Sequence, residues 1–182
     1  MYIDPTTGRL DEATYIPSPN HDERANPTDI GLLVIHGISL PPGEFGGPYI
    51  SALFTNQLDP QVHEYFQGIA ALHVSAHLLI RRDGSLIQYV PFHLRAWHAG
   101  KSCYAGRDGC NDFSIGIELE GTDDQPYEPA QYTQLGAVTR ALMQAYPGIT
   151  RDRIAGHCDV APGRKTDPGP YFDWAYYFSL LA

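Results

Sequence analysis

Short runs of apolar residues alternate along the chain with longer polar stretches that are rich in glycine and proline. Gly31–His36 is a continuous run of Leu, Val and Ile that ends on a histidine, a pattern typical of a strand buried on both faces. Ala76–Ile80 and Leu86–Val90 are two further β-like runs, with Asp83-Gly84 between them. Because Asp-Gly favours the tight turn of a hairpin, these two runs are predicted to pair as neighbouring strands.

The second half of the chain shows both periodicities. In Ser114–Glu120, apolar and other residues alternate, which is the period of a strand and places Glu118 and Glu120 on the same face. Pro129–Tyr146 has apolar residues at the three- and four-residue spacing of an amphipathic helix. Arg153–His157 is a candidate for a fifth, shorter strand. Shorter helices are predicted at Pro48–Gln57, residues 61–67 and Asp173–Leu181.

These elements predict an α/β fold with a mixed central sheet of about five strands flanked by helices. A chain of 182 residues is of the right size to form a single domain, residues 1–182. Residues 1–29 are polar and proline-rich, and we expect them to form an extended arm packed on the surface. The 18 glycines and 15 prolines indicate long ordered loops around the regular core.

Composition disfavours several classes of function. The formal net charge is −9, whereas a nucleic-acid-binding protein normally has a basic face. No apolar stretch approaches the length of a membrane span, and the first residues lack the pattern of a secretory signal. The three cysteines, an odd and low number, suit free thiols in a reducing compartment. We therefore expect a cytoplasmic protein, monomeric, with neither a nucleic acid nor a membrane as its partner.

Histidines supply candidate chemistry, although none belongs to a short metal-binding motif such as HExxH. His36 ends the first strand, and its position suits a packed core residue as well as a metal ligand. His98 lies in a loop that we expect to face a substrate, whereas His77, within a strand, suits packing. Any metal site in this chain would therefore be assembled from distant segments.

One loop, Gly156–Pro170, concentrates functional side chains. His157, Lys165 and Asp167 all lie in it, together with three prolines that restrict the backbone. Rigid loops with mixed charge suit a preorganised site, although a solvated charged loop would have a similar composition.

Five segments together resemble the zinc-dependent N-acetylmuramoyl-L-alanine amidase family, and they run in the order of that family over nearly the whole chain. They are Val34–Gly46, Val74–Gly84, Arg95–Gly100, Cys110–Gly121, and Gly156–Pro170 with Phe172–Trp174. The resemblance implies that Zn²⁺ is held by His36, His157 and Asp167. It also implies that Glu118 acts as the base and that Lys165 stabilises the oxyanion.

The activity implied by this resemblance is hydrolysis of the amide bond between (1,6-anhydro)-N-acetylmuramic acid and L-alanine, with a small muropeptide of murein recycling as substrate. Three protein ligands would leave a fourth zinc position open, as in catalytic sites. Two alternatives are an endolysin or autolysin that acts on intact peptidoglycan, and a muropeptide-binding receptor without catalysis. A thiol hydrolase built on Cys158 and His157 is a third, but neighbouring residues rarely face each other usefully.

Candidate substrate contacts follow from side-chain chemistry. Trp97 is suited to stack on a sugar ring, and arginines pair with the carboxylates of a peptide. The chain departs from the family at Gly37, where Asn often follows the first ligand, and at Gly109, where some relatives have Arg. Arg107 is the nearest candidate to replace that arginine. The predicted substrate-binding residues are Trp97, His98, Arg107, Asn111 and Arg164.

Overall fold

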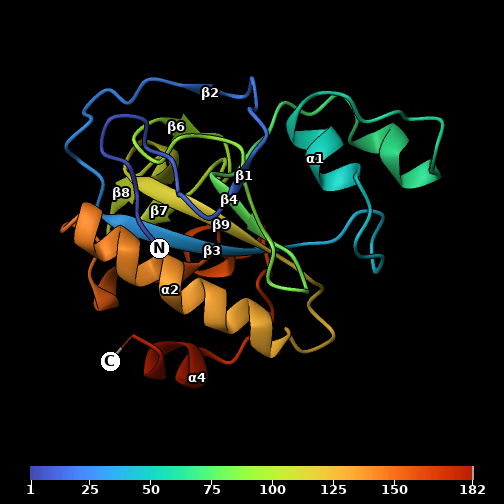
Figure 1. The fold of residues 1–182 in the computed structure, drawn as a ribbon. Coiled ribbons are helices and arrows are strands. Elements are labelled where there is room, and N and C mark those ends of the chain that lie inside the picture. Colours follow the sequence, from blue (N-terminus) through green and yellow to red (C-terminus); the bar gives the residue numbers. More distant parts are fainter. Residues whose placement is uncertain (182) are drawn as a thin grey trace.

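The computed structural model describes residues 1–181 and has a six-stranded mixed sheet at its centre (Figure 1). The pair β4–β5 is antiparallel, and the other neighbours are parallel. From one edge to the other the strands are β1 (Thr14–Tyr15), β5 (Leu86–Gln88), β4 (Leu78–Ile80), β9 (Ser114–Glu120), β3 (Leu32–Ile38) and β10 (Ile154–Gly156).

One face of the sheet is covered by two helices, α2 (Pro129–Ala145) and α4 (Trp174–Ser179). In Figure 1, α2 lies along the sheet and α4 lies on the outer side of α2. Helix α2 begins at Pro129, and proline suits the first turn of a helix because it has no N–H to leave unpaired. Leu135, Val138 and Leu142 of α2 pack in one cluster with the odd-numbered residues of β3 and β9, as the two periodicities require.

The even-numbered residues of β3 and β9 point to the opposite face, which is covered by shorter elements. These are α3 (His157–Val160), the turn η2 (Cys110–Asp112), the strands β6 (Arg95–Ala96), β7 (Cys103–Tyr104) and β8 (Arg107–Asp108), and the loops between them. Leu32 and Val34 pack there against Ala99, Cys110 and Val160. This is the face on which His36 and Glu118 lie.

Beyond the carboxyl end of β3, the chain forms α1 (Tyr49–Phe54) and the 3-10 turn η1 (Glu64–Gly68), which stand to one side of the sheet in Figure 1. Ile50, Leu53, Phe54 and Phe66 are buried in a second apolar cluster with Tyr89. A further 3-10 turn, η3 (Arg151–Arg153), precedes β10.

The N-terminal residues run across the surface and add strands at two places. β1 pairs with β5 at the edge of the main sheet, and β2 (His21–Asp22) pairs with β6. Buried Asn20 is hydrogen-bonded through its side chain to Asn56 (2.8 Å) and to the carbonyl of Val74 (2.8 Å). Polar contacts therefore attach this segment to the rest of the protein.

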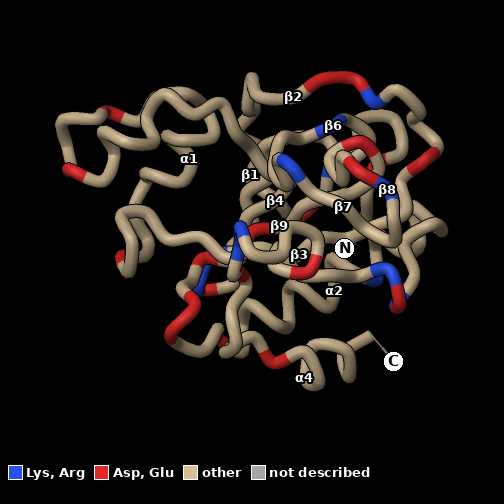
Figure 2. Tube along the Cα trace, turned by 180° about the vertical axis from the view of Figure 1, so that it is seen from behind, with Lys and Arg blue, Asp and Glu red and all other residues tan. Residues whose placement is uncertain are grey.

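The predicted α/β class and mixed sheet are confirmed, with six strands where about five were expected. The extra strand, β1, comes from a polar segment without periodicity. Charged positions are dispersed around the tube in Figure 2, with Asp and Glu more numerous than Lys and Arg. Within residues 1–181, no helix has the length and apolar character needed to cross a bilayer.

Candidate metal centre

The site begins at the carboxyl ends of three adjacent parallel strands. His36 on β3 is the register partner of Glu118 on β9, and residues paired in parallel strands point to the same face. His157 directly follows β10, whose last residue, Gly156, is paired with Ile35. Parallel strands end at a common edge, where α/β proteins tend to bind ligands, so residues 36, 118 and 157 meet there.

The loop after α3 brings Asp167 to the same edge. The backbone carbonyl of Asp167 accepts the N–H of Cys158 (2.9 Å), and its Oδ2 accepts the N–H of Gly37 (3.3 Å). These two contacts join the loop to α3 and to β3. Asp167 is thereby held beside both histidines although it lies 10 residues from one and 131 from the other in sequence.

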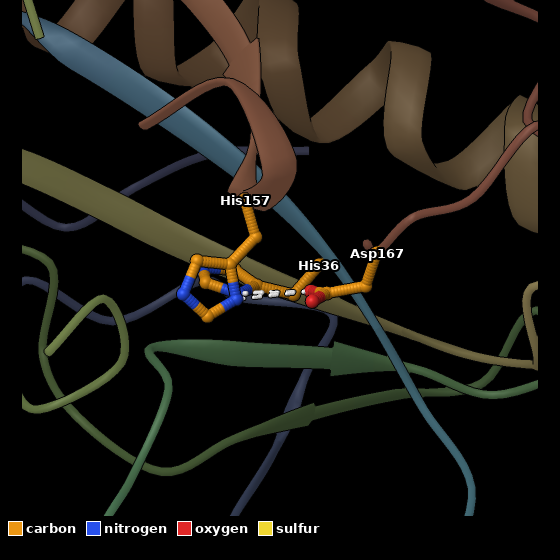
Figure 3. Close-up of side chains that lie close together, drawn as sticks. All are labelled: His36, His157 and Asp167. Atoms are coloured by element: carbon orange, nitrogen blue, oxygen red, sulfur yellow. Dashed lines mark hydrogen bonds and ion pairs between the residues drawn. The ribbon is translucent and has the colours of Figure 1, made fainter. Parts of the chain in front are cut away.

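The three side chains point toward one another (Figure 3). His36 Nδ1 lies 2.9 Å from His157 Nδ1, and Asp167 Oδ2 lies 3.4 Å from the former and 3.1 Å from the latter. Ligand atoms about 2.1 Å from a zinc ion at the corners of a tetrahedron are about 3.4 Å from one another. The donor set and its spacing therefore fit three ligands of one small divalent cation.

The surroundings keep these groups in the states that a metal requires. Burial lowers the pKa of His36 to about 4, so the ring is neutral at pH 7 and keeps a lone pair. Burial alone would raise the pKa of Asp167, but the His157 and His36 rings beside the carboxylate bring it below its ordinary value. Two imidazoles and one carboxylate bound to a dication would leave the site with a net positive charge.

Glu118 lies beside the cluster with one oxygen free. Its side chain is buried, and Oε2 has no hydrogen-bond partner among the described residues. Burial raises the pKa of Glu118 well above its ordinary value, the charge of Asp167 raises it further, and Lys165 opposes both. A buried carboxyl group with a free oxygen next to a metal-binding cluster is suited to exchange a proton with a ligand.

A cavity of about 340 Å³ opens onto the cluster, and His157, Asp167, Glu118 and Lys165 all line it. An apolar part of the lining comes from α1, η1 and the residues after them. It consists of Leu53, Phe54, Tyr65, Ile69 and Leu72.

The sequence profile described as N-acetylmuramoyl-L-alanine amidase matches residues 26–170. The chain belongs to this family. The resemblance inferred from five segments is thus confirmed, and it extends to the amidases called AmpD. The 1,6-anhydro-N-acetylmuramyl-L-alanine amidase AmpD of Citrobacter freundii is 62% identical over 174 residues, which cover 96% of this chain and 92% of that protein.

Solved structures of this amidase family share the fold. A crystal structure of a selenomethionine derivative of AmpD superposes with a TM-score of 0.96 at 60% identity and covers 100% of both chains. The amidase AmiD from E. coli, solved with the substrate anhydro-N-acetylmuramic acid-L-Ala-D-gamma-Glu-L-Lys, has a TM-score of 0.61 at 29% identity. The match covers 94% of this chain and 60% of the AmiD chain.

The structure brings together some of the predicted substrate-binding residues of this amidase. Trp97 and His98 line the 340 Å³ cavity, and the indole Nε1 of Trp97 is buried without a partner among the described residues. Arg164 instead lines a neighbouring cavity of about 600 Å³. Its guanidinium donates to the carbonyls of Ala99 (2.6 Å) and Lys101 (2.8 Å).

Two predicted residues lie away from the cluster. Arg107 is exposed, pairs with Asp29 (2.6 Å) and lies over the ring of Phe113. Asn111 is buried, and its Oδ1 accepts the backbone N–H groups of His98 (3.1 Å) and Ala99 (2.8 Å). Asn111 thus holds the backbone of the cavity wall, and neither side chain lines the cavity.

Sequence patterns missed the apolar wall and the reason for Gly37. Tyr65 and Leu72 are each 47% exposed. In the sequence, the available signal for this wall was large apolar residues in a segment with no clear strand or helix periodicity. In the structure, their exposure is typical of a binding surface. A Cβ on Gly37 would overlap the hydroxyl of Tyr127, which donates to the carbonyl of Pro168 (2.9 Å). Tyr127 therefore excludes a side chain at position 37.

Proposed function

We propose that this chain is a zinc-dependent amidase that hydrolyses the bond between 1,6-anhydro-N-acetylmuramic acid and L-alanine in muropeptides. The observation that carries the proposal is the convergence of His36 Nδ1, His157 Nδ1 and Asp167 Oδ2 beside the free carboxyl oxygen of Glu118. The similarity to AmpD over 96% of the chain supports the choice of substrate.

His36, His157 and Asp167 would hold the metal. When bound, zinc would polarise the scissile carbonyl and lower the pKa of a water to about 7. The three side chains of the protein would hold the ion and would leave it free to bind a water and the substrate, as in catalytic zinc sites. An amide needs such help because its carbonyl is a weak electrophile and its nitrogen is a poor leaving group.

Glu118 is assigned as the general base and acid. Its free oxygen would take a proton from the attacking water and then deliver a proton to the nitrogen of the leaving L-alanine. The raised pKa of Glu118 suits both steps, because a carboxylate with a higher pKa takes a proton from water more readily than one with an ordinary pKa. The resulting carboxyl group can still pass the proton to the leaving nitrogen. The register pairing with His36 holds Glu118 at a fixed distance from the metal ligands.

Lys165 is assigned to stabilise the negative charge that develops on the carbonyl oxygen. It lines the cavity from the loop that also holds Asp167, and that loop is attached to α3 by two hydrogen bonds to the carbonyl of Ala161 (both 3.1 Å), from the N–H groups of Arg164 and Lys165. A positive charge held there before the reaction costs no reorganisation as the oxyanion forms.

Lys165→Ala should lower kcat by about a hundredfold or more, since one oxyanion donor is worth roughly 3–4 kcal/mol. Zinc content should stay at the wild-type level because Lys165 is not a ligand. Lys101→Ala is the matched control, because Lys101 is the other of the two lysines and lines the neighbouring cavity. Equal kcat values for Lys165→Ala and wild type would show that the assignment is wrong.

The cavity has features suited to a sugar joined to a peptide. Trp97 offers an aromatic face and an N–H that has no partner among residues 1–181, and the wall around Tyr65 and Leu72 offers apolar surface. Aromatic and apolar surfaces pack on the faces of sugar rings. We assign the muramyl group to this part of the cavity and the scissile bond to the space between the metal ligands and Glu118.

Comparison of two substrates separates the proposed enzyme from an endolysin or autolysin. Soluble 1,6-anhydro-N-acetylmuramyl peptide should be hydrolysed efficiently, with L-alanine as the new N-terminus detected by mass spectrometry. Peptides should be released from insoluble peptidoglycan much more slowly. Preferential release from peptidoglycan would favour the endolysin, and binding of muropeptide without hydrolysis by the zinc-loaded protein would favour the receptor.

We place this activity in the cytoplasm. The three cysteines, Cys103, Cys110 and Cys158, carry free thiols, which suits a reducing compartment. Burial raises the pKa of Cys158, whereas a reactive thiol usually has a lowered pKa. His157 directs Nδ1 toward His36 and Asp167, and this orientation supports the metal site over a Cys158–His157 pair.

A further inference from the structure

The side chain of His98 continues the cluster outward from the metal ligands. Its Nδ1 lies 2.9 Å from Nε2 of His36, and its Nε2 lies 3.1 Å from Oγ of Ser114. Ser114 is fully buried, and its Oγ lies 2.6 Å from the carbonyl oxygen of Cys110. The chain of contacts therefore runs from His36 through His98 and Ser114 to a backbone carbonyl.

The proton positions along this series of hydrogen bonds follow from its last contact, between Ser114 and the carbonyl of Cys110. Two oxygen atoms 2.6 Å apart need a proton between them, and a carbonyl has none, so Ser114 donates to Cys110. Ser114 has a single proton, so it accepts from His98, and Nε2 of His98 carries the hydrogen. The two nitrogens of His98 face a histidine and a hydroxyl group, neither of them an anion. With one N–H on the ring, at Nε2, Nδ1 of His98 is an acceptor.

The consequence falls on the metal ligand. An acceptor at Nδ1 of His98 requires that Nε2 of His36 donates, and a neutral imidazole has one N–H. Nδ1 of His36 is then bare, and Nδ1 is the atom that faces His157 and Asp167. We propose that His98 is a positioning residue that sets the tautomer and the orientation of His36 for metal binding, an inference that rests on the proposed zinc site.

The neighbouring residue does the same for the second histidine ligand. The carbonyl of Ala99 lies 3.3 Å from Nε2 of His157, and a carbonyl only accepts, so Nε2 carries a hydrogen and Nδ1 of His157 is the nitrogen left for a metal. Asn111 holds the backbone N–H groups of both His98 and Ala99. One short segment therefore orients both histidines, which explains why Asn111 is buried beneath the cavity wall.

Gly116 provides the space for this arrangement. A Cβ on Gly116 would overlap the ring of His98, so the imidazole packs directly on the backbone of β9. The N–H of Gly116 donates to Nδ1 of His77 (3.0 Å). Because His77 directly precedes β4, this contact ties β9 to the segment that leads into the neighbouring strand. A glycine at this even-numbered position of β9 is thus required by His98.

Two variants of the same shape test the proposal in the metal-free protein. His98→Asn keeps an acceptor oxygen close to the position of Nδ1, whereas His98→Leu has the same branched shape and no acceptor. Zinc affinity is measured by competition with a chelator, and folding is checked by circular dichroism. His98→Leu should bind zinc about 10–100-fold more weakly, the loss typical when a metal-ligating histidine loses its hydrogen-bond partner. His98→Asn should recover most of the affinity.

A second measurement needs no variant. Histidine side-chain ¹⁵N spectra of the zinc-loaded wild-type protein should show the hydrogen on Nε2 of both His36 and His98. Wild-type zinc affinity in His98→Leu, or an Nδ1–H tautomer at His98, would overturn the role of His98 and leave the amidase proposal intact. Failure of the wild-type chain to bind zinc would overturn the proposed function and this inference with it.

Discussion

Glu118→Gln should lower kcat by roughly 10²–10⁴-fold, the usual contribution of general acid–base catalysis, and should leave zinc binding unchanged. Glutamine keeps the size of the side chain but takes no proton from water at neutral pH. The buried position and the free Oε2 of Glu118 make it the group at the cluster that is suited to this transfer. Steady-state kinetics on an anhydro-muropeptide, with zinc content measured on the same sample, provides the readout.

Glu120→Gln is the matched control for this substitution. Glu120 lies on the same face of β9 two residues later and is also buried. Its Oε1 accepts the N–H of Gly46 (2.7 Å) and lies 3.5 Å from a guanidinium nitrogen of Arg81. We expect this variant to be less stable to heat but to keep kcat within a few-fold. Equal losses of kcat in both variants would assign the effect of Glu118→Gln to structure and contradict its role as the base.

Asp167→Asn should lower zinc affinity by more than the roughly 10–100-fold loss expected from an outer hydrogen-bond partner. The amide has nearly the same shape as the carboxylate but no negative charge, so the metal would keep two neutral ligands and a weak third. Activity at limiting zinc should fall in parallel. Chelator competition measures the affinity, and kcat at saturating zinc separates weak binding from a damaged reaction.

Asp159→Asn controls for the loss of one charge near the site. Asp159 lies two residues after His157, and its Oδ2 accepts the N–H of Gly156 (2.7 Å), a contact that the amide oxygen of Asn can also make. Zinc affinity in this variant should remain close to that of the wild type. If Asp167→Asn bound zinc as tightly as Asp159→Asn, Asp167 would not be a ligand.

Much of the scaffold followed from sequence periodicity. The alternation in Ser114–Glu120 placed Glu118 on one face, and the strand that ends near His36 was recognised by its apolar run. Because these two strands are parallel neighbours, the positions read separately from sequence became paired residues in the sheet. The helix at Pro129–Tyr146 was also recognised, since its apolar spacing matches the face that packs on the sheet.

The metal cluster itself was beyond the reach of periodicity. His36 and His157 are 121 residues apart, and their meeting depends on β10 pairing with β3 at the far edge of the sheet. No local pattern determines that pairing, because each strand is short and apolar. Similarity to a known family supplied the ligand set before any geometry did, and the distances between Nδ1 and Oδ2 atoms then agreed with it.

The partners of each side chain explain why residue type alone could not predict which residues line the cavity. Arg107 and Asn111 have the chemistry of peptide-binding residues, but one pairs with Asp29 and the other with the backbone of the cavity wall. His98 lines the cavity, as expected of a residue that faces the substrate, but both of its ring nitrogens also have protein partners. Residue type indicates what a side chain is able to bind, whereas its actual partner depends on segments that are distant in sequence.

We propose that His36, His157 and Asp167 hold a catalytic zinc ion. The most direct test is to measure zinc per chain and hydrolysis of 1,6-anhydro-N-acetylmuramyl-L-alanyl peptide before chelation, after chelation and after zinc is restored. We expect one zinc per chain, loss of hydrolysis when the metal is removed, and recovery when it returns. Full hydrolysis by protein shown to be free of metal would contradict the account.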